Sequence, residues 1–279
     1  MKYYHVDVFT NKALSGNGLT VIENDETLTP DQMQLIAQEF KQFETIFFNH
    51  RNNYVARIFT IEEELEFAGH PILGLGAVIH TEDYSQKDEI NCSIQLSKKT
   101  VVIESKREED YYKVSMNQGK AEWGQSITKE WQEKFCKAMQ IEEQMLDPRY
   151  PMEIVSTGLP YLLIPIRADL EKVKISCQNL EELLSKNGAK FVYVFDINKM
   201  EGRTWDNLGQ VEDVATGSAA GPVGAYLYKW GYYTQKEQII LHQGRFVGRP
   251  SELFISMNEK DEMIVSGNVK LIAKGEVKL

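Results

Sequence analysis

The sequence predicts an α+β protein made of two similar lobes, and three observations lead to that prediction. The chain has 279 residues, which suits one large domain or two of ordinary size. Short strand patterns recur along it, separated by a few helical stretches. An approximate internal repeat then relates the first half to the second, and each copy contains a helix rich in glycine and alanine. Together these features predict two similar α+β lobes.

The first half opens with a strand pattern at 4–9, in which Val6 and Val8 share one face. A Gly-Asn-Gly turn precedes a second strand at 19–22. Thr29-Pro30-Asp31 marks the start of a helix, with a capping residue followed by proline in the first turn. A strand at 44–48 follows, in which Glu44 alternates onto one face with two apolar residues. Further strands are predicted at 55–59, 90–96, 100–104, 111–116, 153–156, 161–166, 191–195 and 202–206, and further helices around 131–139 and 178–186.

The internal repeat consists of equal spacings between the same residue types. They are Arg57 to Glu66 with Arg203 to Glu212, and Gly69 to Gly76 with Gly217 to Gly224. Glycine inside a helix costs about 1 kcal/mol relative to alanine. The helices predicted at 71–80 and 219–230 therefore make sense where something packs very close to them, and a curved sheet wrapped around a central helix is one such setting.

Each repeated helix starts with a polar or proline-containing turn. Gly69-His70-Pro71 and Thr216-Gly217-Ser218 place free backbone N–H groups at a helix N-terminus, where carboxylates and phosphates bind. For a single helix, a capping role for Ser218 is the simpler interpretation. Two matched helix starts in a repeated chain favour a site for a small anionic molecule between the lobes.

Composition and charge exclude several classes of function. The formal net charge is -10, and clustered Lys and Arg for phosphate contacts are absent, so nucleic-acid binding is not expected. The three cysteines form no CxxC pair, and the five histidines show no HxxxH spacing, so no metal site, zinc site or disulfide framework is expected. No signal peptide or membrane-spanning run is visible. A cytoplasmic protein that binds neither membrane nor nucleic acid is the default expectation.

Several short segments, in order along most of the chain, resemble the PhzF family, which takes its name from an isomerase of phenazine biosynthesis. They are Val6-Asp7-Val8-Phe9-Thr10, Gly16-Asn17, Glu44-Thr45, Glu64-Leu65-Glu66-Phe67-Ala68-Gly69-His70-Pro71, Val155-Ser156-Thr157-Gly158, Glu212-Asp213-Val214-Ala215-Thr216-Gly217-Ser218-Ala219, Gln243-Gly244-Arg245 and Gly248-Arg249-Pro250-Ser251. The resemblance implies the diaminopimelate-epimerase-like α+β fold, in which each of two similar lobes wraps a curved, mainly antiparallel sheet around a central helix. The N-terminal lobe is expected at 1–118 and the C-terminal lobe at 119–279. The resemblance also implies a homodimer and allows the last strand to return to the first lobe.

The resemblance places the catalytic carboxylate of the family on Glu44. His70 and Asp213 match supporting polar residues, and the substrate-lining positions are Gly69, Gly217 and Ser218. From the residues alone, Glu44 is equally a solvated glutamate, while His70 is a cap or core histidine and Asp213 a residue that orients its loop. The chain departs from the usual family pattern at three positions that each adjoin a motif residue, which are Gly18, Phe43 and Val214. These departures affect which substrate is expected and how polar the pocket beside Glu44 is.

The function expected on this basis is that of an isomerase without cofactor or metal, in which a glutamate moves a proton on a small carboxylate substrate. An epimerase or racemase of an amino or hydroxy acid is the first alternative, and a non-catalytic protein that binds small anions is the second. A racemase with two catalytic thiols is disfavoured, because Cys92, Cys136 and Cys177 all lie away from the two helix starts.

Overall fold

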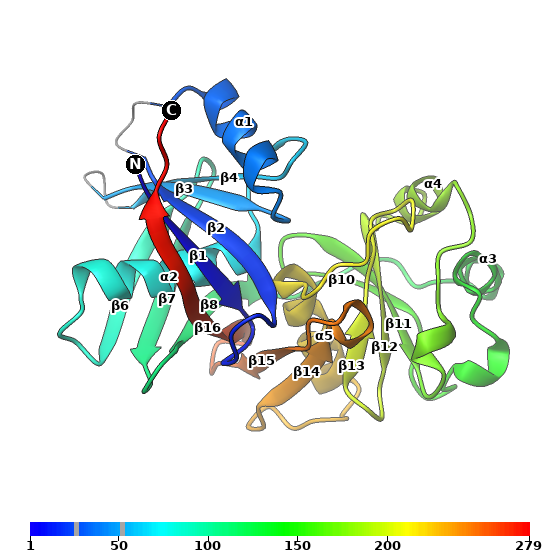
Figure 1. Ribbon diagram of the computed structural model, residues 1–279. Helices are drawn as coiled ribbons and strands as arrows, with labels where there is room; N and C mark the ends of the chain where they lie inside the picture. The colour runs from blue at the N-terminus through cyan, green and yellow to red at the C-terminus, as the bar shows by residue number, and fades with distance from the viewer. Residues whose placement is uncertain (25–27, 51–53) are drawn as a thin grey trace. The chain divides into compact units, whose positions relative to one another are not determined.

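The computed structural model of the chain describes residues 1–24, 28–50 and 54–279. It divides into two compact units, of which one comprises Met1–Asn117 with Ser266–Leu279 and the other Gln118–Val265. Both are α+β, with the strands much more numerous than the helices (Figure 1). Two long strands, β8 (Tyr112–Lys120) and β16 (Glu262–Glu276), carry the chain from one unit into the other.

The first unit is a ring of strands around a helix. In hydrogen-bonded order the strands are β1 (Lys2–Val8), β2 (Asn17–Glu23), β3 (Thr45–Asn49), β4 (Val55–Phe59), β6 (Glu89–Gln95), β7 (Thr100–Arg107), β8 and β16, and the two-residue strand β5 (Glu64–Leu65) pairs with β4. Because β1 also pairs with β16, the sheet closes on itself. The pairs β2–β3 and β4–β6 are parallel. The antiparallel pairs are β1–β2, β1–β16, β3–β4, β6–β7 and β7–β8.

Helix α2 (Gly69–Asp83) lies inside this ring and is buried from Gly69 to His80 (Figure 1). Its glycines allow the strands to approach closely. A Cβ atom at Gly74 would lie 2.3 Å from a methyl carbon of Leu19, and one at Gly76 would lie 2.8 Å from Ile103. These are distances that real Cβ contacts do not reach, so the glycine and alanine content of this helix reflects its central position.

Helix α1 (Pro30–Phe40) covers the outer face of β3 and β4. Thr29 and Gln32 form a reciprocal capping box at its start, with Pro30 at the first helical position, as the sequence predicts. Its apolar face packs into a small core of buried residues that are Ile22, Met33, Ile36, Ala37, Phe47 and Phe59. This packing holds β3 in place, and with it the residue that precedes the strand, Glu44.

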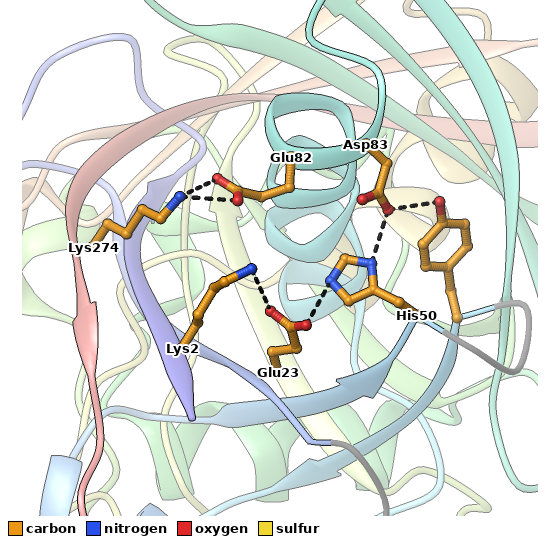
Figure 2. Close-up of polar contacts among 7 residues, drawn as sticks. Lys2, Glu23, His50, Glu82, Asp83 and Lys274 are labelled. Atoms are coloured by element: carbon orange, nitrogen blue, oxygen red, sulfur yellow. Dashed lines mark hydrogen bonds and ion pairs between the residues drawn. The ribbon is translucent and has the colours of Figure 1, made fainter.

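A cluster of charged and aromatic side chains surrounds the C-terminal end of α2, and Figure 2 shows it. We call it the rim cluster. Its members are the six residues labelled in Figure 2, which are Lys2, Glu23, His50, Glu82, Asp83 and Lys274, together with Tyr54, which hydrogen-bonds to Asp83. The imidazole of His50 lies between two carboxylates, with Nε2 3.3 Å from Glu23 and Nδ1 2.9 Å from Asp83. The Tyr54 hydroxyl also donates to Asp83, at 2.8 Å, and Lys274 Nζ lies 2.7 Å from Glu82. The cluster therefore ties β1, β2, β16 and the ends of β3 and α2 together.

The second unit repeats the theme of a buried helix against a mainly antiparallel sheet. In hydrogen-bonded order its strands are β16, β15 (Ser251–Met257), β14 (Ile239–Gln243), β13 (Glu201–Arg203), β12 (Phe191–Asp196), β11 (Pro160–Ile166), β10 (Glu153–Ser156) and β9 (Glu122–Trp123). Helix α5 (Gly217–Lys229) packs against β10, β11 and β15. A Cβ atom at Gly224 would lie 2.4 Å from Ile255, so this helix too is approached closely by a strand.

The remaining helices of the second unit enclose a separate apolar core. They are α3 (Lys129–Met139), α4 (Leu180–Ser185) and the short 3-10 helices η1 (Glu143–Met145), η2 (Leu170–Lys172) and η3 (Arg245–Val247). Phe135, Leu162 and Leu180 are all fully buried in this core. No helix in the described part of the chain is both long and apolar enough to cross a membrane.

The two Arg–Glu spacings of the repeat do not form matching ion pairs. Arg203 binds Glu212 at 2.6 Å and is nearly buried with it. Arg57 instead binds Glu64, also at 2.6 Å, while Glu66 pairs with Lys98. The two helices are therefore the part of the sequence repeat that the structure shows in equivalent settings.

Candidate functional site

Glu44 directly precedes β3, one residue outside the strand that the sequence predicts to include it. Thr45, the first residue of that strand, pairs with Thr20 on one side and with Phe59 on the other. The side chain of Glu44 is 17% exposed, and one of its carboxylate oxygens lies 3.4 Å from Nδ1 of His70. The fold of the first unit therefore brings together two residues that the sequence places far apart.

His70 lies in the first turn of α2, which begins at Gly69, two residues earlier than the sequence predicts. The residue that precedes the helix, Ala68, has extended backbone and supplies no capping side chain. The first N–H groups of a helix have no partner within it, and the partial positive charge of the helix dipole is concentrated there. The N-terminus of α2 can therefore receive a negatively charged group beside Glu44.

Burial determines the charge of His70. The residue is only 4% exposed, and its Nε2 atom has no hydrogen-bond partner of normal geometry among the described residues. Burial lowers the pKa of His70 to about 3, and the backbone of Gly18 opposes this only in part. An ionised Glu44 at 3.4 Å would favour the imidazolium, but a charged ring would lose its hydration at this depth. His70 is therefore neutral at neutral pH.

In the second unit, Asp213 and the start of α5 form a hydrogen-bonded group. The helix begins at Gly217, and the residue before it is Thr216, whose side chain does not cap the helix. Instead, the Thr216 hydroxyl donates to Oδ2 of Asp213 at 2.5 Å. The hydroxyl of Ser218 lies 2.7 Å from that of Tyr161. Because the helix begins at Gly217, Ser218 lies inside its first turn, and the alternative that Ser218 caps this helix is wrong.

Two residues of this group were not singled out as site residues by the sequence analysis. The side-chain amide of Gln243 contacts both the Asp213 backbone and Thr216, and the Tyr193 hydroxyl donates to Gln243 at 2.9 Å. Gln243 belongs to the Gln-Gly-Arg segment that contributes to the family resemblance, and this was its only signal. A lone tyrosine within an apolar strand, such as Tyr193, carries no signal of its own.

Among the residues that the structure describes, neither metal ligands nor reactive thiols gather near this site. The described residues contain no group of three or more His, Cys, Asp or Glu side chains that could hold a metal ion. Burial raises the pKa of Cys92 and of Cys136 to about 11, which makes these thiols poor nucleophiles. A carboxylate beside a neutral imidazole is a group that can take up a proton and return it.

Comparisons with known proteins find matches along nearly the whole chain. A family model described as phenazine biosynthesis-like protein (PhzC-PhzF) matches residues 6–275. An uncharacterized isomerase of Clostridium acetobutylicum is 31% identical, over 99% of this chain and 97% of its own length. The trans-2,3-dihydro-3-hydroxyanthranilate isomerase of Pseudomonas chlororaphis is 29% identical, over 99% of each chain. A solved structure named as a predicted epimerase from Pseudomonas aeruginosa is 42% identical with a TM-score of 0.93, over 99% of this chain and 98% of its own.

Proposed function

The chain belongs to the phenazine biosynthesis-like protein family, and we propose that it is an isomerase which moves a proton within a small carboxylate substrate. Glu44 is the proposed acid and base, and the reaction needs no cofactor. The observation that carries this proposal is the position of the Glu44 carboxylate, 3.4 Å from a buried, neutral His70 at the uncapped start of α2. Relatives along the whole chain bear the name isomerase.

The chemistry follows from this pairing. A base that takes a proton from carbon must lie within hydrogen-bond reach of that proton. It must also keep its basicity, which a permanent ion pair with a cation would lower. A protonated histidine would form a strong ion pair with Glu44, whereas a neutral imidazole leaves the carboxylate basic. The same carboxyl group, once protonated, can return the proton to another carbon. His70 then stabilises the charge that shifts through the substrate between these two steps.

The proposed donor to the substrate carboxylate beside Glu44 is the backbone N–H of Gly69 at the start of α2, which has no side-chain cap. In the second unit, Gly217 and Ser218 at the equally uncapped start of α5 are proposed as anion-binding positions. Because backbone donors are fixed before the substrate arrives, they orient it at little cost. Asp213 is proposed as a substrate-binding residue of the second unit that accepts a hydrogen bond.

The test is a comparison of Glu44→Gln with a matched control. The amide keeps the shape of the glutamate but cannot accept a proton, so turnover should fall by roughly 10²–10⁴-fold. The product should then no longer incorporate deuterium from the solvent. The first substrate to try is trans-2,3-dihydro-3-hydroxyanthranilate, the compound in the name of the Pseudomonas chlororaphis relative. A panel of small carboxylates screened by thermal shift follows.

The control is Glu23→Gln, because Glu23 has an exposed fraction of 18% against 17% for Glu44 and belongs to the same unit. It lies in the rim cluster, so the activity of the folded variant should equal that of the parent. If Glu44→Gln turned over substrate and exchanged deuterium like the parent, Glu44 would not be the proton carrier.

An epimerase is the second candidate, and a specific observation favours it. The solved structure that is 42% identical to this chain is named as a predicted epimerase. An epimerase returns the proton to the carbon from which it came, on the opposite face, whereas an isomerase of the proposed kind returns it to a different carbon. Chiral analysis and the position of the deuterium in the product distinguish the two.

A further inference from the structure

Gln243 begins a Gln-Gly-Arg segment for which the proposed reaction gives no role. We propose that Gln243 is a positioning residue that acts on Asp213 through Thr216. It fixes the direction of the Thr216 hydroxyl, so that this hydroxyl always donates to Asp213 and holds its carboxyl group in the ionised, accepting form. The inference rests on the proposed function only in taking Asp213 as a substrate-binding residue.

The first step is the orientation of the Gln243 amide, which its backbone partners determine. The residue is 1% exposed. Its Oε1 atom accepts from the backbone N–H of Thr216 at 3.2 Å, and its Nε2 atom donates to the backbone carbonyl of Asp213 at 2.9 Å. A flipped amide would place two donors against each other at one end and two acceptors at the other. Only one orientation therefore satisfies both contacts.

The second step transfers this direction to Thr216. The remaining N–H of the Gln243 amide donates to the Thr216 hydroxyl oxygen at 2.9 Å. That oxygen is thus an acceptor on one side, and its own proton has to point elsewhere. The acceptor that the structure provides is Oδ2 of Asp213, at 2.5 Å, a distance typical of a hydroxyl that donates to a charged oxygen.

Tyr193 and Gly244 hold the amide itself in place. The Tyr193 hydroxyl donates to Oε1 of Gln243 at 2.9 Å. Burial, with a contribution from the charge of Asp213, raises the pKa of Tyr193 well above its ordinary value, so this group stays a donor. Gly244 has a φ of +84°, and a Cβ atom there would lie 2.6 Å from the carbonyl oxygen of Val214. The segment after Gln243 therefore packs directly against the loop that carries Asp213.

These contacts form one chain of donors in which each hydrogen bond points toward Asp213. It runs from Tyr193 to Gln243, from Gln243 to Thr216, and from Thr216 to the carboxylate. A carboxylate that receives such a bond resists protonation. Asp213 is therefore suited to accept a hydrogen bond from a hydroxyl or ammonium group of the substrate, and unsuited to donate a proton to carbon. This assigns proton transfer to Glu44 and anchoring to Asp213.

The experiment measures the titration of the Asp213 carboxyl group directly and needs no substrate. The protein is labelled with ¹³C at aspartate carboxyl carbons, and the Asp213 signal is identified by its loss in Asp213→Asn. Thr216→Val removes the hydroxyl and keeps the shape, so the Asp213 midpoint should rise by about one pH unit. Gln243→Met frees the hydroxyl to rotate, so it should raise the midpoint by a smaller amount.

Two variants separate this effect from a general loss of structure. Thr216→Ser keeps the hydroxyl and should restore the parent midpoint. Tyr226→Phe removes another hydroxyl of a buried residue of the same unit, one that donates to the Pro151 carbonyl at 2.7 Å, and it should leave the midpoint unchanged. An Asp213 midpoint that stayed at the parent value in Thr216→Val, or that rose equally in Tyr226→Phe, would overturn the proposal. Because the readout is a titration, its failure is distinct from a failure of the proposed isomerase activity.

Discussion

His70 and His80 lie on the same helix and are both buried, yet the hydrogen bonding of their ring nitrogens differs. His80 is fully buried; its Nε2 donates to the Lys87 carbonyl at 2.9 Å, and its Nδ1 lies 2.8 Å from the Ser105 hydroxyl. His70 has the carboxylate of Glu44 at 3.4 Å from Nδ1 and a backbone contact with Gly18, but its Nε2 has no hydrogen-bond partner of normal geometry among the described residues. Burial alone therefore does not separate the two histidines, whereas the completeness of their hydrogen bonding does.

The surroundings of the two helix ends show the same contrast. The C-terminal end of α2 is enclosed by the rim cluster, in which carboxylates and cations are matched (Figure 2). The N-terminal end has Glu44 and an uncapped first turn. A buried polar atom without a partner costs roughly 1–3 kcal/mol. Such a cost at one end of an otherwise well-paired helix is typical of a position kept for a ligand.

The largest expected effect is a difference in the free energy of unfolding between the variants His80→Leu and His70→Leu. His80→Leu leaves the Ser105 hydroxyl and the Lys87 carbonyl without their partner, and it should lower the free energy of unfolding by about 2–4 kcal/mol. His70→Leu removes an unpaired nitrogen and one long contact, so it should change the free energy of unfolding by less than about 1 kcal/mol while abolishing activity. Urea denaturation at pH 7 measures both values, and equal losses of stability would remove the distinction.

A smaller effect concerns pH and isolates His70. In the unfolded chain an imidazole has a pKa of about 6.5, whereas in the folded protein burial lowers the pKa of His70 to about 3. Between these values the unfolded state binds the extra proton, so stability is complete above pH 6.5 and is lost as the pH falls toward 3. The contribution lost by pH 5 is about 2 kcal/mol.

His70→Leu lacks this titration. Its stability relative to the parent should therefore improve by about 2 kcal/mol on going from pH 7 to pH 5, as measured by urea denaturation at both values. Parallel pH profiles for the parent and the variant would show that burial does not control the charge of His70.

The smallest expected effect lies in the rim cluster. His50 is partly exposed and contacts two carboxylates that are also partly exposed. Solvent screens such pairs, so His50→Ala should cost at most about 1 kcal/mol. Tyr54→Phe, which removes a single hydrogen bond to Asp83, should cost no more than that. Thermal unfolding of both variants checks this, and a loss as large as that of His80→Leu would place the rim cluster among the main stabilising features.

The sequence predicts the two central helices well because their composition has a physical cause. Glycine and alanine at contact positions signal close packing, and the structure confirms it at Gly76 and Gly224. The exact starts were missed by two residues, since Ala68 and Thr216 precede the helices without a side-chain cap and so leave no capping signature. Glu44 was placed inside a strand that in fact begins with Thr45.

Other features have no local pattern from which they could be predicted. His70 and His80 stand in one apolar run, and their different pairing depends on Ser105 and Lys87, which lie outside the helix. The contact between Gln243 and Thr216 joins segments 27 residues apart. Sequence periodicity describes which face of an element is buried, but hydrogen-bond partners across elements depend on the fold as a whole. The roles of Glu44, His70 and Asp213 in the proposed reaction stay predictions.

The closed ring of the first unit has a consequence for the order of folding. Its sheet is completed by β16, which pairs with β1 from Val269 to Glu276, and the intervening second unit, Gln118–Val265, is one continuous stretch of chain. During synthesis, α2 therefore lacks part of its surrounding sheet until the residues after 265 have emerged from the ribosome, whereas the second unit can fold earlier. Pairing across so long a loop is slow, so the half that contains Glu44 and His70 should be the last to mature and the one that depends most on chaperones.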